Sequence, residues 1–202
     1  EGLFTERRDA VLDLQSFDLQ AWPDEIQDTP FLRHIHLDAN LIRSIPAAVG
    51  VLTAVEDLSM EHNRLKTIAP ELENLTRLRT LRLAYNQLDV VPPCMEAYVC
   101  LTHLDLSHNH ITILPPELFR CISLLHLLLD ANQITELPPE FAQLHNIQTL
   151  SYDKNPVIIP PDEIRMGGIQ EMLRFYDLVL SNAPGCTILG MEQEGVGGKL
   201  NL

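Results

Sequence analysis

The side chains of this sequence best suited to chemistry are its histidines and the carboxylates beside them. His103 and Asp105 stand two residues apart, and His126 follows His103 after 23 residues. Imidazole nitrogens and carboxylate oxygens are common zinc ligands. These three residues therefore suggest a metal site. Exposed histidine–carboxylate pairs are also common without a metal, so we expect no metal and no cofactor.

The same region holds the residue types of a nucleophilic enzyme. Asp105, Ser107 and His108 are close in sequence. A serine nucleophile needs a base within hydrogen-bond reach and a further group that orients the base. Because successive side chains of a strand alternate in direction, Ser107 and His108 are not placed together. The sequence also lacks a phosphate-binding loop, a G-x-S-x-G elbow and an H-E-x-x-H motif. We expect no enzymatic activity.

These residues lie inside a pattern that repeats every 23 residues. Each repeat has an x-L-x-L-x segment, and this alternation predicts a short strand whose leucines point inward and whose other side chains point outward. Prolines after the strands fix the backbone of a return turn. One asparagine per repeat is expected to bond backbone groups of its own and neighbouring loops. The asparagines are Asn40, Asn63, Asn86, Asn109, Asn132 and Asn155.

The repeat resembles that of the leucine-rich repeat family. Residues 124–146 carry the L-x-x-L-x-L-x-x-N-x-L core of that family, and the resemblance covers about residues 12–180. It implies the α/β fold class and a leucine-rich repeat solenoid, with a parallel concave sheet, convex turns and a C-terminal capping helix.

The ends of the array depart from the pattern. Residues 2–10 are expected to form a short helix or turn. Phe17 stands where an asparagine belongs, because the terminal turn has no preceding loop to bond. The expected divisions are an N-terminal cap and degenerate first repeat over 1–31, leucine-rich repeats over 32–161, a C-terminal capping helix over 162–182 and a flexible tail over 183–202.

Composition restricts the class of partner. The hydrophobic content is 46 % with 5 % aromatic residues, which predicts an aliphatic core, and the formal net charge is −14. Because phosphates are bound by lysine and arginine, this charge argues against a nucleic-acid partner. It fits a protein partner with a basic patch, or a role in solubility alone. No apolar run approaches the ~18 residues of a membrane span.

The cysteines bear on the cellular location. Secreted leucine-rich repeat proteins resemble one another in cysteine clusters at both ends. Residues 155–179 resemble instead the ending of leucine-rich repeat domains of the Ras-scaffold and Roco type. We therefore expect a reducing compartment and a cytoplasmic location. The four cysteines, which form no cluster, are Cys94, Cys100, Cys121 and Cys186.

The outward positions of the strands form the surface on which solenoids bind their partners. Seven of the eight histidines fall on this face or its rim; only His145 does not. Three interpretations stay open: a polar surface with incidental histidines, a protein-binding face, and a metal or pH-responsive site. Arginine and tyrosine are enriched at binding hot spots. The candidate partner-binding residues are Arg82, Tyr85, His103, Asp105, His108, His126, Leu128 and Asp130.

The function we expect is that of a non-enzymatic scaffold that binds a protein partner on its concave face, in a signalling context. Two alternatives stay open. In the first alternative, the chain is the recognition arm of a larger enzyme, such as a GTPase-kinase, a cyclase or a ubiquitin ligase. In the second, it is a structural subunit of a cytoskeletal or ciliary assembly. Fold by itself does not decide among them.

Overall fold

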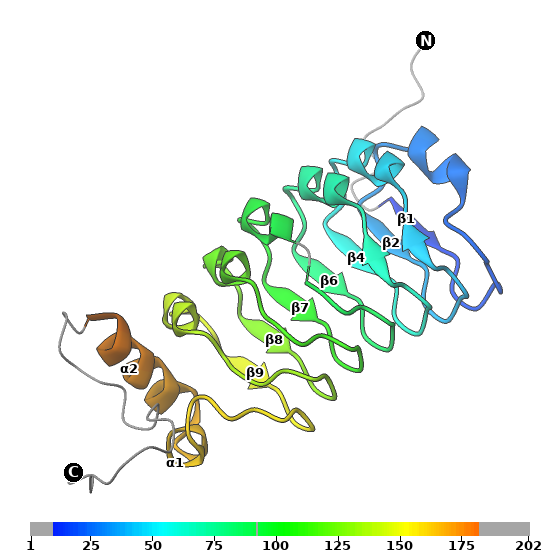
Figure 1. Ribbon diagram of the computed structural model, residues 1–202. Coiled ribbons are helices and arrows are strands. Elements are labelled where there is room, and N and C mark those ends of the chain that lie inside the picture. Colours follow the sequence, from blue (N-terminus) through cyan, green and yellow to red (C-terminus); the bar gives the residue numbers. More distant parts are fainter. Residues whose placement is uncertain (1–9, 92, 182–202) are drawn as a thin grey trace, which may run out of the picture.

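The computed structural model describes residues 10–91 and 93–181. This part of the chain is an elongated stack of coils, and each coil adds one strand to a common sheet (Figure 1). The flexible tail expected over 183–202 lies outside the described residues. So does the N-terminal helix or turn expected over 2–10, apart from Ala10, which is buried.

The sheet is parallel, and its strands follow one another in chain order. His103 lies beside His126 and Leu104 beside Leu127, so the 23-residue register predicted from the sequence is confirmed. Each strand has three residues, fewer than the x-L-x-L-x segment, because the chain turns soon after the second leucine. The strands are β1 (Val11–Asp13), β2 (His34–His36), β4 (Asp57–Ser59), β6 (Thr80–Arg82), β7 (His103–Asp105), β8 (His126–Leu128) and β9 (Thr149–Ser151).

Short 3₁₀-helices form the opposite side of the stack (Figure 1). Pro46, Pro115 and Pro138 lie immediately before three of them, in extended backbone, as the predicted return turns require. β3 (Ser44–Ile45) and β5 (Thr67–Ile68) add a two-stranded sheet that the sequence pattern did not indicate. The 3₁₀-helices are η1 (Asp24–Asp28), η2 (Ala47–Val51), η3 (Pro70–Asn74), η4 (Pro93–Ala97), η5 (Pro116–Arg120) and η6 (Pro139–Gln143).

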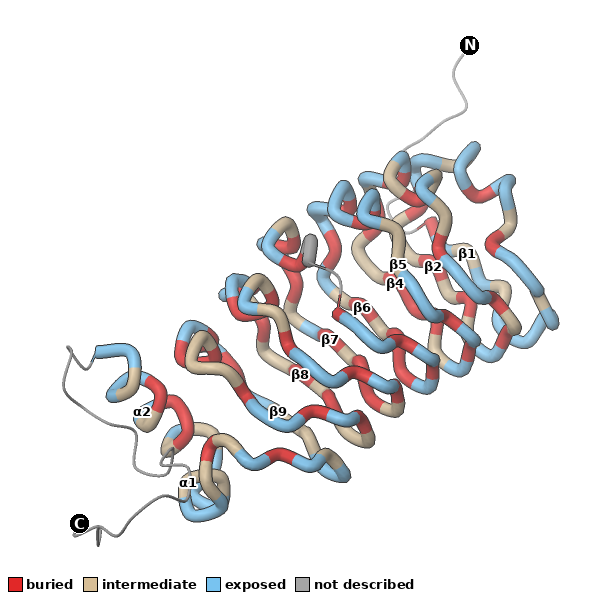
Figure 2. The backbone as a smooth tube through the Cα atoms, in the orientation of Figure 1, coloured by how far each residue is buried: buried red, intermediate tan, exposed pale blue. Residues whose placement is uncertain are grey.

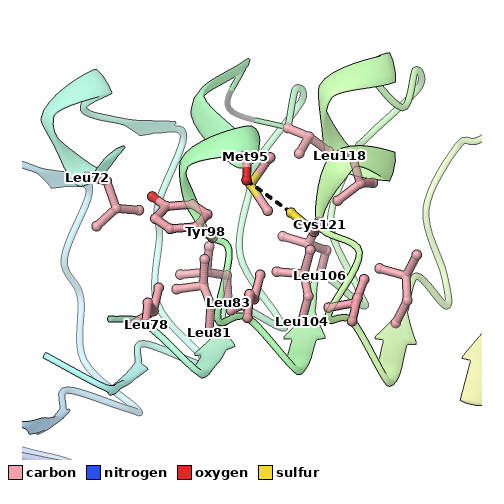
Figure 3. Packing of buried hydrophobic residues seen from close by; sticks show 14 of the residues in the cluster. Leu72, Leu78, Leu81, Leu83, Met95, Tyr98, Leu104, Leu106, Leu118 and Cys121 are labelled. Carbon is pink, nitrogen blue, oxygen red and sulfur yellow. Dashed lines mark hydrogen bonds between the residues drawn. The ribbon is translucent and has the colours of Figure 1, made fainter. Parts of the chain in front are cut away.

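One continuous apolar core fills the space between the sheet and the 3₁₀-helices. Buried segments recur at the same place in every coil (Figure 2). Leu104 and Leu106 point into this core from one coil, beside Leu81 and Leu83 of the coil before (Figure 3). Cys121 takes a leucine position, is buried, and donates its thiol hydrogen to the Met95 carbonyl at 3.0 Å.

The asparagine of each coil joins that coil to the preceding one. The Asn109 amide nitrogen donates to the Leu83 carbonyl at 3.0 Å and to the Leu106 carbonyl at 3.0 Å. Its amide oxygen accepts the Leu88 backbone N–H at 3.0 Å. The same bonds recur from Asn40 to Asn155, which confirms the structural role predicted for these side chains.

The first repeat shows why an asparagine is dispensable there. Phe17 is exposed, and its backbone N–H donates to the Asn40 side chain of the next coil at 3.1 Å. The loop of the first coil is therefore supported from the second. An asparagine at position 17 would find no earlier loop among the described residues. Trp22 and Ile26 keep the core positions of this degenerate repeat.

The C-terminal end is closed by two helices, where the sequence suggested one over 162–182. α1 (Asp162–Met166) and α2 (Gly168–Ser181) are separated at a glycine pair, and Gly168 has a φ of 79°, which glycine adopts without steric cost. α2 packs on η6, and Tyr176 lies edge-on to Phe141 with ring centroids 6.1 Å apart. Leu180, at the end of this helix, is 52 % exposed.

The register predicts a large effect of a core truncation. Leu106 is 1 % exposed. Leu106→Ala should lower the free energy of unfolding by about 2–5 kcal/mol, because it removes buried methyl groups and leaves a cavity. Urea unfolding monitored by circular dichroism measures this change. Ile113→Ala, at a residue 72 % exposed, is the control and should change stability little. Equal effects of the two variants would contradict the register.

The asparagine bonds predict a second effect. Asn109→Ala removes the partner of several backbone groups, one of which is the buried Leu88 N–H. The free energy of unfolding should fall by about 1–3 kcal/mol, the cost of leaving a buried polar group without a partner. Asn146, whose amide makes one exposed bond to the Ile122 carbonyl, provides the control Asn146→Ala. A smaller loss for Asn109→Ala than for this control would be evidence against the structural role.

Candidate functional site

The concave sheet brings together side chains from repeats that are far apart in sequence. In β6, β7 and β8, Thr80, His103 and His126 are direct neighbours. Arg82, Asp105 and Leu128 form the parallel column beside them. Five of the eight candidate residues therefore lie on three adjacent strands. The other three, Tyr85, His108 and Asp130, lie in the loops that follow those strands.

Another column runs along these loops and consists of the residue before each asparagine. We call it the loop column. Its backbone lies in the left-handed region, with φ of 53° at His62, 55° at Tyr85 and 55° at His108. The Tyr85 ring stacks between two imidazoles, at a centroid distance of 4.1 Å from His62 and 4.0 Å from His108, with interplanar angles of 12° and 10°. We call His62, Tyr85 and His108 the ring stack. His62 was not among the predicted site residues, although its position 23 residues before Tyr85 was visible in the sequence.

The histidine pair of the strands also stacks. The rings of His103 and His126 have centroids 4.3 Å apart and an interplanar angle of 30°. His103 Nδ1 lies 2.9 Å from the Thr102 hydroxyl, and His126 Nδ1 lies 3.0 Å from the Thr149 hydroxyl. Desolvation, and then the neighbouring His126 and Arg82, lower the pKa of His103. In the described part of the chain, no group of three or more histidine, cysteine or acidic side chains is arranged to hold a metal ion.

Arg82 pairs with the acidic residue of the preceding strand. Its Nη1 lies 3.1 Å from Asp57 Oδ1, so Arg82 forms its ion pair with Asp57. Asp105 lies on the strand at the other side of Arg82. Asp57 Oδ2 is also 3.8 Å from His36 Nε2 and 4.0 Å from His34 Nδ1. The sequence does not indicate this cluster because His34 and His36, Asp57 and Arg82 come from three different coils.

Asp130 is engaged within the fold. Its Oδ1 accepts bonds from the Ser151 hydroxyl and from the Asp153 backbone N–H, both at 2.6 Å. Asp38, four repeats earlier in the chain, makes the same two bonds with Ser59 and Glu61, also at 2.6 Å each. These carboxylates join neighbouring coils, and a partner would compete with those bonds.

Two carboxylates of the concave face have a different environment. Asp105 Oδ1 accepts the Ser107 backbone N–H at 2.9 Å and therefore serves the local turn. Glu61 makes no side-chain hydrogen bond or ion pair with another described residue. Desolvation, followed by the charges of Asp38 and Asp105, raises the pKa of Glu61.

Leu128 lies half-buried between Asp105 and Ser151 on the same face.

Comparisons with known proteins agree with this architecture. The family model described as leucine rich repeat matches residues 30–88 and 100–157. No curated protein sequence matches the chain. Among the described residues, no helix is long and apolar enough to cross a membrane.

Two similar solved structures are parts of plant receptors. The plant peptide hormone receptor RGFR1, in complex with RGF2, is 25 % identical with a TM-score of 0.62 over 67 % of this chain and 22 % of the receptor chain. The ectodomain of the Arabidopsis thaliana membrane receptor kinase GASSHO1/SCHENGEN3, in complex with CASPARIAN STRIP INTEGRITY FACTOR 2, is 26 % identical with a TM-score of 0.61 over 72 % of this chain and 21 % of that chain. This chain thus spans about a fifth of each receptor chain.

The cytoplasmic location expected from the cysteines is wrong by this comparison, because the similar structures include the ectodomain of a membrane receptor. The physical reason is that the array is held by leucine packing and asparagine bonds, which form equally well in either redox environment. An absence of cysteine clusters therefore carries no information about the compartment.

The environment of Glu61 predicts a pH effect on stability. Its folded-state pKa is raised above the ordinary 4.5, so the folded protein holds this proton more tightly than the unfolded chain does. Stability is therefore lost as the pH rises from about 4.5 through the folded pKa. Glu61→Gln should be more stable than the wild type at pH 7, and this gain should shrink at pH 4.

Urea unfolding at both pH values checks this expectation. Glu73→Gln, at an exposed residue of η3, is the matched control. The stability difference between Glu61→Gln and the wild type could instead be independent of pH or grow toward low pH. Either result would show that the folded structure does not raise the pKa of Glu61.

Proposed function

The chain belongs to the leucine-rich repeat family, and from this premise we propose that it is a non-enzymatic module that binds a protein partner on its concave face. The fold suggests protein–protein interaction, since solenoids use the extended concave sheet as their binding surface. The observation that carries the proposal is the concentration of Arg82, Tyr85 and Leu128 within three successive coils of that surface.

The surroundings of these residues support the choice of face. The 3₁₀-helices occupy the opposite side of the stack, and α1 and α2 lie at its end (Figure 1). Neither group covers the outward side chains of the central strands. Tyr85 is 46 % exposed and is held in one orientation by the two imidazoles that stack on it. A ring held in this way loses little side-chain entropy when a partner contacts it.

Charge indicates the kind of partner. The concave columns carry the carboxylates of Asp57, Glu61 and Asp105 near the centre, while Arg82 is already paired with Asp57. A polypeptide segment with basic side chains complements this surface. Both similar receptors are described in complex with a second molecule, a peptide hormone system in one case, and this supports an extended peptide segment as the bound element. With a formal net charge of −14, we expect no nucleic-acid partner.

The biological context we propose is a scaffold in signalling. It is supported by the resemblance of residues 155–179 to the ending of Ras-scaffold and Roco-type leucine-rich repeat domains, and by the receptor function of the similar structures. A second candidate is the recognition arm of a larger protein. It is favoured by the comparison in which this chain corresponds to about a fifth of each receptor chain.

A capture experiment tests the choice of face. The wild type and the variant Arg82→Glu, Tyr85→Ala, Leu128→Lys are used to capture proteins from cell extract, with identification by mass spectrometry. We expect at least one protein that the wild type recovers and the variant loses. Thermal unfolding of both proteins first establishes that both are folded.

A second triple variant controls for general changes in charge and polarity. Arg77→Glu, Phe31→Ala and Ile113→Lys make similar changes at exposed residues outside the strands of the concave sheet. This control should recover the same proteins as the wild type. If the concave variant keeps every protein that the wild type binds, binding takes place elsewhere and the proposal fails.

A further inference from the structure

The ring stack ends at small residues on both sides. In the loop column, the coil before His62 carries Ala39, and the coil after His108 carries Ala131. Both alanines have the same left-handed backbone as the rings, with φ of 54° and 51°. A methyl group cannot cover an imidazole. The outer face of each terminal histidine is therefore open to a planar group placed over the neighbouring alanine.

The spacing of the stack suits such a group. Successive rings lie 4.0 to 4.1 Å apart, close to the ~4.8 Å separation of the strands that carry them. A planar side chain one further step along the column would continue the same arrangement. Ala39 is exposed, and so is Ser16 in the coil before it. Within residues 10–61, nothing larger than these two side chains occupies the column.

The two ends of the stack differ in charge. At the His62 end, Glu61 directly precedes the histidine and Asp38 directly precedes Ala39. The Glu61 carboxylate bonds no other described side chain, and the negative charges of Asp38 and Asp105 act on it. At the other end, neutral Ser107 precedes His108. Asp38 and Asp130 each accept a serine hydroxyl of the next coil, so the two ends differ in having Glu61 at one and Ser107 at the other.

A planar surface next to carboxylates selects one side chain among the common ones. The guanidinium group of arginine is flat, stacks on aromatic faces and donates to carboxylates. Lysine has the same charge but no plane to stack, and a neutral aromatic ring would leave the carboxylate without a cation. Arg64 of this chain does not take the position, since it forms no ion pair and no ring contact within the described residues.

We propose that the open face of His62 above Ala39 binds an arginine side chain from an extended basic segment of the protein partner. We call this position the arginine site. The guanidinium group stacks on His62 as the next member of the ring stack and donates hydrogen bonds to Glu61, with Asp38 adjacent. This inference rests on the proposed function and adds the residue type by which the concave face recognises its partner.

A substitution at Ala39 can fill the arginine site. Ala39→His places an imidazole where the same backbone conformation already carries an imidazole at His62 and His108. The matched control is Ala131→His, which extends the stack by one ring at the end where Ser107 takes the place of Glu61. His62→Ala is a second route to the same test, because alanine already occupies this column at two positions.

The probes are two fluorescent peptides of equal charge, one with four Ser-Arg units and one with four Ser-Lys units, and affinity is measured by anisotropy at low salt. The wild type should bind the arginine peptide about two- to fivefold more tightly than the lysine peptide, as an exposed cation–ring contact provides. Ala39→His, His62→Ala and Glu61→Gln should reduce this ratio toward one. Ala131→His should keep it. Equal affinity of the wild type for the two peptides, or equal ratios for Ala39→His and Ala131→His, would overturn the proposal.

The capture experiment separates this inference from the proposed function. If a partner is lost by the concave triple variant and also by Ala39→His, but not by Ala131→His, both are supported. If the partner is lost by the triple variant and kept by Ala39→His, the arginine site is refuted and binding on the concave face is supported. If the partner is kept by the triple variant, the proposed function itself is refuted.

Discussion

The hydrogen bonds of one asparagine per coil are the interaction on which the rest of the structure depends. A short coil turned inward brings backbone carbonyl and N–H groups into an apolar interior, where an unpaired polar group is costly. The amide of Asn86 satisfies several of these groups at once, in its own coil and in the preceding one. Because the bonds join coil to coil, they fix the register as well as the turn.

The concave surface inherits its order from this register. Side chains at equal positions are brought next to one another in column after column, so the properties of the surface are properties of columns. The left-handed residue before each asparagine illustrates the point. Its position is set by the turn, and three such positions carry rings that stack at about the spacing of the coils. The ring stack is thus a direct product of the element that closes each coil.

The period alone predicted much of the fold. The strand register follows from six asparagines at one spacing, the buried leucines follow from the x-L-x-L-x alternation, and the place of the return turns follows from the prolines. The pattern predicts one helix over 162–182, and the glycine pair within it is where α1 and α2 separate. The columns also predicted which candidate residues are neighbours on the sheet, such as His103 and His126.

Side-chain orientations were beyond the sequence. Arg82 has acidic residues on both neighbouring strands, and only geometry selects Asp57. The bonds of Asp130 to Ser151 join residues 21 positions apart, a spacing that has no meaning until the coils are stacked. The location could not be derived either, because packing and amide bonds hold the array in any compartment.

The direction of the asparagine bonds also makes the array polar in a mechanical sense. The loop of each coil is supported by the asparagine of the coil that follows it, as the Ile111 N–H is by Asn132 and the Ile134 N–H by Asn155. Loss of a coil from the C-terminal side therefore removes the side-chain acceptor of a loop N–H in the coil before it. Loss from the N-terminal side removes a different kind of partner, the backbone carbonyl that accepts an N–H of the following loop, as the Ile111 carbonyl accepts the Gln133 N–H. Since the stability of such arrays is a sum over nearest neighbours, the two ends of the stack leave different polar groups to be satisfied. The packing of α2 against η6 closes the C-terminal end.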